Sequence, residues 1–359
     1  MNTRDRAAAL ASACQTFPFL GSTTEDDLLA YVAAELGDAE ALDTWVPHGR
    51  HSARAIAPQT ILHILASNTP AAALQTLVRG LLLGANNLAK LPSSRLPEVE
   101  EFKAALPAPL AERLIFSHRL ADSWLERADA VVVFGDDETI AHFRSQLRPG
   151  QIFSAHGHKV SLGFVFDDPG CTSVTAAAED VAAFDQLGCL SPHAFYVAGE
   201  ARTYAARLAQ ALDRMALEEV PMEASIEIRA WREDYGFRAA NGEPCLVLAS
   251  TNTTQWTVVY DETPSFPMTP LYRCIVVKPL PADLPAELRM VANHLSCAGI
   301  FPATPENAAS LIRRGFSRIC PLGQMQKPHW TWHQDGTDPL AELVRWVDFE
   351  AGATSPTNV

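Results

Sequence analysis

The sequence predicts an α/β protein with a doubly wound parallel sheet. Three observations support this class. The chain has 359 residues, the length of about two domains. Hydrophobic residues make up 48% and charged residues 19%, which leaves ample material for a core. Short apolar runs of strand length alternate with segments of helical periodicity, which is the pattern of β-α-β units.

The N-terminal part of the chain is predicted to be helical, over residues 7–13 and 25–36. Ser22 and Glu25 have the spacing of a capping box before the second of these helices. These segments precede the alternating pattern, so we expect them to pack outside the first sheet.

A first β-α-β unit is predicted from residue 61 onward. Residues 61–66 form an apolar run of strand length, and Pro70 suits the first turn of a helix over residues 71–83. Residues 87–91 read as the next strand. Such a unit implies that the two strands are parallel.

The alternation continues along the rest of the chain. Further strands are expected over residues 129–134, 159–166, 194–197, 245–249 and 274–277. Further helices are expected over residues 137–147, 173–187, 200–215, 286–296, 306–313 and 340–349. We place the domain boundary so that residues 1–184 form one domain and residues 185–333 a second, with residues 334–359 returning to the first.

Composition excludes several classes of function. The formal charge is −14, from 42 acidic and 28 basic residues, which argues against non-specific binding to nucleic acid or to anionic membranes. We expect no membrane span, because no window holds 18 uncharged apolar residues. The seven cysteines are scattered, without a C-x-x-C motif or an export signal, so a reduced, cytoplasmic protein is expected.

Common ligand motifs are absent from the sequence. Two close histidine pairs, His156 with His158 and His329 with His333, have no third ligand nearby, so we predict no metal site. Neither G-x-G-x-x-G nor G-x-x-x-x-G-K-[ST] occurs. A nucleotide could still bind to the sheet, but not through either of those loops.

Cys189 is the candidate nucleophile. It follows Gly188 in a junction between a predicted helix and a predicted strand, and glycine there lets the backbone bend and a substrate approach. A cysteine at such a junction is a plausible thiolate nucleophile. On local sequence alone, an ordinary loop cysteine is the favoured explanation of this position.

Several segments occur in an order that resembles the acyl-CoA reductase family of the aldehyde dehydrogenase superfamily, which includes the fatty-acid reductase component of bacterial luminescence. The segments are Asn68-Thr-Pro70, residues 84–94, Phe134-Gly135, the Asp185-Gln186 to Pro192 motif, and residues 321–336 with their Trp-x-x-Asp-Gly ending. The resemblance implies a Rossmann-type cofactor domain and a second α/β domain that carries the catalytic thiol.

The resemblance also implies an activity. Cys189 would attack a fatty acyl thioester, on acyl-CoA or an acyl carrier protein, and form an acyl-enzyme. The side chain of Asn68 and the backbone N–H of Cys189 would stabilise the oxyanion. NADPH would then reduce the acyl group to an aldehyde. An acyl-activating partner enzyme and a homodimer or homotetramer are further expectations.

Lys90, Ser93 and Gly135 are the cofactor-binding residues that the resemblance implies. Lys90 would meet the adenosine ribose. Ser93 stands where many superfamily members have glutamate, and losing that carboxylate favours NADPH, with NADH still possible. Gly135 would let the pyrophosphate approach the next helix, although acids at residues 136–138 would oppose a phosphate placed directly on it.

Departures from the superfamily pattern keep two alternatives open. Aldehyde-oxidising members carry a general-base glutamate where this chain has Ala155, which argues against hydrolysis of the acyl-enzyme unless His156 or His158 acts as base. Aldehyde oxidation is therefore one alternative. The weakened cofactor signature favours the other, an acyl-transferring or acyl-binding protein without redox turnover. Acyl chain length and the identity of the donor stay open.

Overall fold

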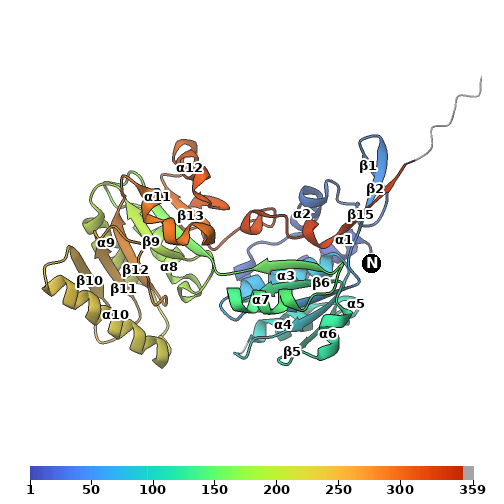
Figure 1. Ribbon diagram of the computed structural model, residues 1–359, viewed down its shortest axis with the longest axis horizontal. Helices are drawn as coiled ribbons and strands as arrows, with labels where there is room; N and C mark the ends of the chain where they lie inside the picture. Colours follow the sequence, from blue (N-terminus) through green and yellow to red (C-terminus); the bar gives the residue numbers. More distant parts are fainter. Residues whose placement is uncertain (95, 351–359) are drawn as a thin grey trace, which may run out of the picture. The chain divides into compact units, whose positions relative to one another are not determined.

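The computed structural model describes residues 1–94 and 96–350, and its internal contacts divide the chain into two units (Figure 1). Unit 1 contains Met1–Gly157 and the segment from His329 onward, and unit 2 contains His158–Pro328. The division thus falls earlier than residue 185. The reason is that strand β8 (Val160–Val165) pairs with strands of unit 2. The chain returns to unit 1 at His329, and residues 351–359 lie outside the described residues.

Unit 1 is built around a five-stranded parallel sheet in the order β5-β4-β3-β6-β7. Its strands are β3 (Thr60–Ile64), β4 (Asn86–Lys90), β5 (Leu114–Ser117), β6 (Ala130–Phe134) and β7 (Ile152–His156). The strand order reverses between β3 and β6. This is the topological switch point, beside which ligands bind in doubly wound sheets.

Helices cover both faces of this sheet, as the prediction required. They are α3 (Pro70–Leu82), α4 (Pro97–Ala105), α5 (Ala108–Ala111), α6 (Asp122–Arg127) and α7 (Asp137–Ser145). Ile61 belongs to the core that includes α3 and α4, whereas its neighbour Leu62 packs with Trp124 of α6 and Phe143 of α7. Successive residues of β3 therefore face opposite layers.

The N-terminal helices α1 (Thr3–Cys14) and α2 (Glu25–Leu36) confirm the sequence prediction and pack into the same core as α3. The predicted capping box is wrong by two residues. The hydroxyl of Thr24 caps α2 by accepting a hydrogen bond from the backbone N–H of Asp27, and the Asp27 carboxylate accepts one from the backbone N–H of Thr24. Thr24, rather than Ser22, is the N-cap because it directly precedes the first helical residue, Glu25.

A small antiparallel sheet of β1 (Val46–His48), β2 (His51–Ile56) and β15 (Arg345–Phe349) was not predicted. The helix expected over residues 340–349 is therefore wrong. Only a short 3-10 turn, Ala341–Leu343, precedes β15. Trp346, Val347 and Phe349 favour extended backbone, and pairing with β2 supplies the hydrogen bonds that a helix would have made internally.

Unit 2 contains a seven-stranded sheet in the order β10-β11-β12-β9-β8-β13-β14. Besides β8, its strands are β9 (Pro192–Val197), β10 (Cys245–Ala249), β11 (Thr257–Asp261), β12 (Cys274–Pro279), β13 (Leu295–Phe301) and β14 (Arg318–Pro321). All neighbouring pairs are parallel except β10 with β11. The sheet is thus mixed rather than purely parallel.

The helices of unit 2 are α8 (Val174–Ala182), α9 (Ala201–Asp213), α10 (Met222–Ala240), α11 (Leu284–Glu287) and α12 (Pro305–Leu311). The helix predicted over residues 286–296 is wrong. There α11 and a 3-10 segment, Arg289–His294, lead directly into β13. β13 pairs with β8 and β14 from Leu295 onward, so the helical stretch ends at His294.

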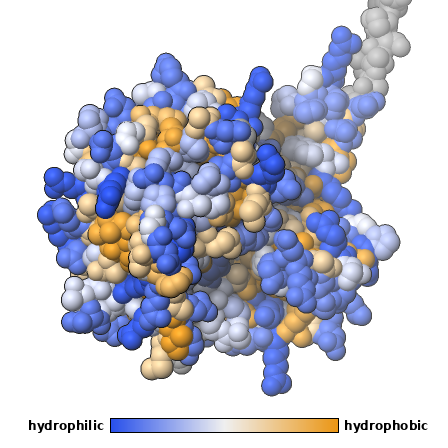
Figure 2. Space-filling model, turned by 60° about the vertical axis from the view of Figure 1, so that its left-hand side comes forward, coloured by the Kyte–Doolittle hydropathy of each residue, from blue (hydrophilic) through white to orange (hydrophobic). Residues whose placement is uncertain are grey.

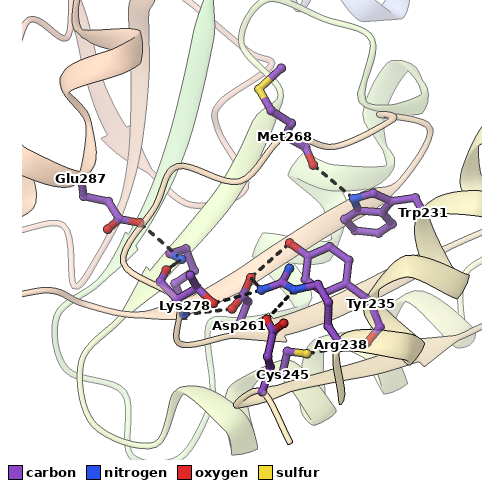
Figure 3. Close-up of polar contacts among 10 residues, drawn as sticks. Trp231, Tyr235, Arg238, Cys245, Asp261, Met268, Lys278 and Glu287 are labelled. Atoms are coloured by element: carbon purple, nitrogen blue, oxygen red, sulfur yellow. Dashed lines mark hydrogen bonds and ion pairs between the residues drawn. The ribbon is translucent and has the colours of Figure 1, made fainter. Parts of the chain in front are cut away.

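Polar contacts at the carboxyl ends of β11 and β12 tie this edge of the sheet to its helices (Figure 3). Tyr235 and Arg238 of α10 donate to one Asp261 carboxylate oxygen over 3.1 and 3.3 Å. Lys278 pairs with Glu287 across 3.3 Å, and both side chains are buried. This edge is closed by paired charges.

The visible surface is largely hydrophilic, with separate apolar patches (Figure 2). Among the described residues, no helix combines the length and apolar character needed to cross a membrane. The same part of the chain holds no cluster of three or more histidine, cysteine, aspartate or glutamate side chains suited to a metal ion.

Candidate active site

Cys189 lies half-buried in a turn that directly precedes β9. The turn is closed by the backbone N–H of Ser191, which donates to the carbonyl of Gly188 over 2.9 Å. The carbonyl of Cys189 accepts a hydrogen bond from the buried hydroxyl of Ser161 on β8 over 2.8 Å. The backbone of the candidate nucleophile is therefore anchored to the neighbouring strand of a rigid sheet.

Ser161 links this turn to a third strand. Its oxygen accepts a hydrogen bond from the backbone N–H of Cys297 on β13 over 3.1 Å. The polar chain runs from Cys297 through Ser161 to Cys189, and Ser161 has no measurable exposure. A buried hydroxyl that both donates and accepts fixes the spacing of the groups on either side of it.

Gly188 is required by a close approach rather than by its backbone angles. A Cβ atom there would come within 3.0 Å of the side-chain oxygen of Gln326 and 3.2 Å of the hydroxyl of Ser191. Gln326 in turn donates to Ser191 over 2.6 Å. Glycine thus lets the amide of Gln326 pack directly on the turn of Cys189.

The loop that carries Gln326 is held by a buried carboxylate. Asp180 of α8 accepts hydrogen bonds from the backbone N–H groups of Gly323, over 2.6 Å, and Met325, over 3.0 Å. Burial raises the pKa of Asp180 to about 7, against the opposing effect of these hydrogen bonds and of Lys327. Asp180 therefore positions the loop, and its charge changes near neutral pH.

A left-handed backbone segment precedes the turn. Helix α8 ends at Ala182 rather than at residue 187, and Phe184, Asp185 and Gln186 all have φ between 52° and 62°. The left-handed conformation costs about 1–2 kcal/mol for each such L-residue. The helix prediction failed here because periodicity does not register a change in backbone handedness.

Buried side chains hold this strained segment in place. Arg273, 1% exposed, forms an ion pair with Asp185 and donates to the carbonyls of Gln255 and Glu218. The buried amide of Gln186 donates to the carbonyls of Pro192, over 2.8 Å, and Cys274, over 3.0 Å. The backbone segment that leads into Cys189 is thus held by contacts to both β9 and β12.

Histidines lie beside the amino end of β9. His193 is an aromatic neighbour of His158, with ring centroids 6.5 Å apart, and His158 also contacts His294. Burial, followed by the proximity of His158, lowers the pKa of His193 to about 4. His193 is therefore uncharged at neutral pH.

Unit 1 carries the residues predicted to bind the cofactor and the oxyanion. Asn68 is exposed in the bend between β3 and α3, Lys90 ends β4 half-buried, Ser93 follows it exposed, and Gly135 follows β6. The structure therefore gathers Asn68, Lys90 and Gly135 at the carboxyl ends of adjacent strands around the switch point. Cys189 belongs to unit 2.

The start of α7 fits an anion poorly. A Cβ on Gly135 would come within 2.8 Å of Thr139, so glycine there serves helix packing. Asp136 caps the helix by accepting from the backbone N–H of Thr139 over 2.8 Å, and this hydrogen bond lowers the pKa of Asp136. A carboxylate already occupies the position expected for phosphate.

His156 is tied to the Trp-x-x-Asp-Gly motif. One ring nitrogen lies 2.9 Å from a carboxylate oxygen of Asp335, and the ring stacks on Phe134 with centroids 4.5 Å apart. Ala155 precedes it on β7, so no carboxylate stands at that position. The motif that supported the family resemblance thus has a structural partner at the end of β7.

Sequence reasoning missed the residues that hold the turn of Cys189. Gln326 lies in the family segment of residues 321–336, which is the signal that could have led to it. Ser161, Asp180 and Arg273 carry no local signature, because their partners lie 28, 143 and 88 residues away.

Solved aldehyde dehydrogenases share this fold. The putative aldehyde dehydrogenase PutA from Anabaena variabilis superposes with a TM-score of 0.68 over 100% of this chain and 91% of its own, at 13% identity. A putative methylmalonate-semialdehyde dehydrogenase from Sinorhizobium meliloti, solved with NAD, gives 0.65 over 99% and 87%, at 14% identity. The predicted aldehyde dehydrogenase-like α/β fold is confirmed.

Sequence comparison identifies the family to which the chain belongs. The chain is 24% identical over 341 residues to the long-chain acyl-protein thioester reductase of Aliivibrio fischeri, covering 88% of this chain and 69% of that protein. The corresponding protein of Photorhabdus luminescens is also 24% identical, over 350 residues, 89% of this chain and 69% of that one. The family described as acyl-CoA reductase (LuxC) matches residues 19–346. This chain therefore belongs to the LuxC family of acyl-CoA reductases, which are oxidoreductases.

Proposed function

We propose that this protein reduces a long-chain fatty acyl thioester to an aldehyde through an acyl-enzyme on Cys189, with NADPH as the reductant. The observation that carries the proposal is the anchored turn of Cys189. Ser161 donates a hydrogen bond to the carbonyl of Cys189, and Gln326 packs on Gly188. Arg273 forms an ion pair with Asp185, in the segment before the turn. Such support from rigid elements is what a positioned nucleophile needs.

Acylation is a thioester exchange. The Cys189 sulfur attacks the acyl carbonyl carbon, the bond from that carbon to the donor sulfur breaks, and the donor leaves as a thiol once it gains a proton. Bonds of the same type form and break, so positioning rather than driving force decides the rate. The backbone N–H of Cys189 and the side-chain amide of Asn68 are the proposed oxyanion donors.

A nicotinamide cofactor supplies hydride when bound, and two solved structures of similar fold hold NAD. The ammonium of Lys90 and the hydroxyl of Ser93 suit a phosphorylated ribose at the end of β4. Ser93 adds no carboxylate that would repel a 2′-phosphate, which favours NADPH. Because Asp136 caps the start of α7, we propose no pyrophosphate contact directly on that helix.

Acyl transfer without reduction is a second candidate, favoured by one observation. Asp136 and Thr139 fill the helix start where the cofactor phosphate was expected. Aldehyde oxidation has weaker support, because Ala155 supplies no base and His156 is paired with Asp335.

Intact-protein mass spectrometry tests the proposal. The protein is mixed with palmitoyl-CoA or palmitoyl acyl carrier protein, with and without NADPH. We expect an acyl adduct that disappears as aldehyde forms only when NADPH is present. An adduct that NADPH leaves in place would favour acyl transfer, and no adduct with either donor would overturn the proposal.

Variants assign the site within the same assay. Cys189→Ser should lose the adduct, whereas Cys171→Ser, at another half-buried cysteine of unit 2, should retain it. Asn68→Ala should slow acylation by about 10²- to 10³-fold, the usual cost of one oxyanion donor. Asn86→Ala, at an exposed asparagine of the same unit, is its matched control. Equal rates for the two asparagine variants would remove Asn68 from the site.

A further inference from the structure

Cys297 and Cys320 form a thiol pair on adjacent strands of unit 2. Cys297 on β13 is opposite Arg318 of β14, and Cys320 is opposite Gly299, so the two cysteines share one face of the sheet. Their sulfur atoms are 3.7 Å apart. Cys297 is fully buried and Cys320 is 8% exposed.

The two thiols differ in their surroundings. The hydrogen bond between them lowers the pKa of Cys320, with Arg318 acting in the same direction, whereas burial raises the pKa of Cys297. The guanidinium of Arg318 lies 3.5 Å from the sulfur of Cys297. Cys320 is thus the less buried of the two thiols and the one whose pKa is lowered.

The pair connects to Cys189 from two sides. The backbone N–H of Cys297 donates to Ser161, which donates to the carbonyl of Cys189. Cys320 directly precedes the loop whose Gln326 packs on Gly188. That loop also covers β13, since a Cβ on Gly299 would come within 2.5 Å of the sulfur of Met325.

We propose that Cys297 and Cys320 are a redox-active dithiol that a hydroperoxide oxidises to a disulfide, and that the disulfide slows acylation of Cys189. The dithiol itself stands on the geometry of β13 and β14. Its effect on acylation rests on the proposed function. A disulfide needs the two sulfurs to close from 3.7 Å to about 2.05 Å. That movement displaces both connections to the turn of Cys189.

The oxidation balances with a peroxide as the oxidant. The Cys320 thiolate attacks the hydroxyl oxygen of the hydroperoxide, the O–O bond breaks, and Cys320 becomes a sulfenic acid. The leaving hydroxide or alkoxide takes up the proton that Cys320 released on ionising, which gives one water or alcohol. The Cys297 sulfur then attacks the sulfur of Cys320. The S–O bond breaks, and the leaving hydroxide takes the Cys297 proton as a second water. Two electrons pass from the two thiols to the peroxide.

Peptide mapping tests the disulfide directly. The Cys189→Ser protein is treated with hydrogen peroxide, alkylated and digested with trypsin. Cys297 lies in the peptide of residues 290–313 and Cys320 in that of residues 319–345, each with a single cysteine. We expect the two peptides joined, with the mass of two hydrogens missing, and separated by dithiothreitol. Finding both alkylated, or Cys320 oxidised only to sulfinic acid, would overturn the proposal.

Acylation kinetics test the consequence. Peroxide should slow acylation of the wild-type protein by about tenfold to a hundredfold, as a displacement of about 1 Å can do, and dithiothreitol should restore it. Cys320→Ser, and independently Cys297→Ala, should remove the dithiothreitol-reversible part of this loss. An equal reversible loss in these variants, or a mapped disulfide without a rate change, would overturn the regulatory role. If reduced wild-type protein is never acylated, the proposed function fails. Peptide mapping then still shows whether Cys297 and Cys320 form a disulfide.

Discussion

The candidate site residues lie at opposite edges of the two sheets, at the carboxyl edge in unit 1 and at the amino edge in unit 2. In unit 1, Asn68, Lys90 and Gly135 lie where strands β3, β4 and β6 end, at the carboxyl edge. In unit 2, Cys189 precedes β9 and lies at the amino edge. Parallel sheets usually bind ligands at the carboxyl edge. Unit 1 follows this rule and unit 2 departs from it.

The contacts at the two edges of unit 2 explain the departure. Its carboxyl edge is closed by two pairs of opposite charge, the buried Lys278 with Glu287 and the half-buried Arg238 with the buried Asp261. At its amino edge Ser161 donates a hydrogen bond to the backbone of Cys189, and the left-handed residues before that turn are held by the ion pair of Arg273 with Asp185. One sheet can thus carry a buried ion pair at one edge and the candidate nucleophile at the other.

Lys278→Met should have the largest effect on stability. It leaves the carboxylate of Glu287 buried without its cation, which typically costs about 3–5 kcal/mol. Urea denaturation measures the loss, and acylation per folded molecule should stay unchanged. Lys278→Met with Glu287→Leu should recover most of the stability. Arg4→Met, in an exposed ion pair, should cost less than about 1 kcal/mol. Similar losses for the two single variants would contradict the comparison.

Asp180 should make stability depend on pH. Its folded pKa, about 7, is raised above that of the unfolded chain, so its contribution is present below the unfolded value and is lost as pH rises to about 7. The change between pH 4 and pH 8 is at most about 4 kcal/mol, since each pKa unit corresponds to about 1.4 kcal/mol.

Asp180→Asn is the variant that isolates this effect. Urea denaturation of both proteins across that pH range should show the wild-type protein losing more stability as pH rises. An asparagine variant with the same slope would show that another group is responsible.

Ser161→Ala should lower stability by about 1–3 kcal/mol, because it leaves the buried N–H of Cys297 without its acceptor. Acylation of Cys189 should slow by about tenfold, as the carbonyl anchor is also lost. Ser154→Ala removes a buried serine of unit 1 and should leave the acylation rate near that of wild type. Comparable rate losses in both would show a general packing effect.

Ser93→Glu should have the smallest effect, confined to the cofactor. A carboxylate there should repel a 2′-phosphate and raise the KM for NADPH by about tenfold, or about 1.4 kcal/mol, with little change for NADH. Steady-state kinetics with both cofactors measure this. Ser94→Glu, at the exposed neighbouring residue, is the control. An equal effect of both would place the ribose elsewhere.

The fold class and much of the element order could be predicted from the sequence because they depend on local pattern. Helix α2 matches its predicted range, and β3, β4 and β6 lie within about two residues of theirs. Two of the failures share a cause. β15 replaces a predicted helix, and β13 ends another at His294, because distant partner strands pair with them. Pairing of that kind is invisible to local periodicity.

The sequence by itself determined that the chain has an α/β fold, that Cys189 stands at a junction of elements, and that ordered motifs relate it to acyl-CoA reductases. Only the tertiary structure decided what holds that cysteine. Ser161, Asp180 and Arg273 act on residues far away in the chain, through hydrogen bonds and an ion pair that exist only once β8, β9 and β12 are assembled. Local propensity determines the elements, whereas packing determines which side chains meet.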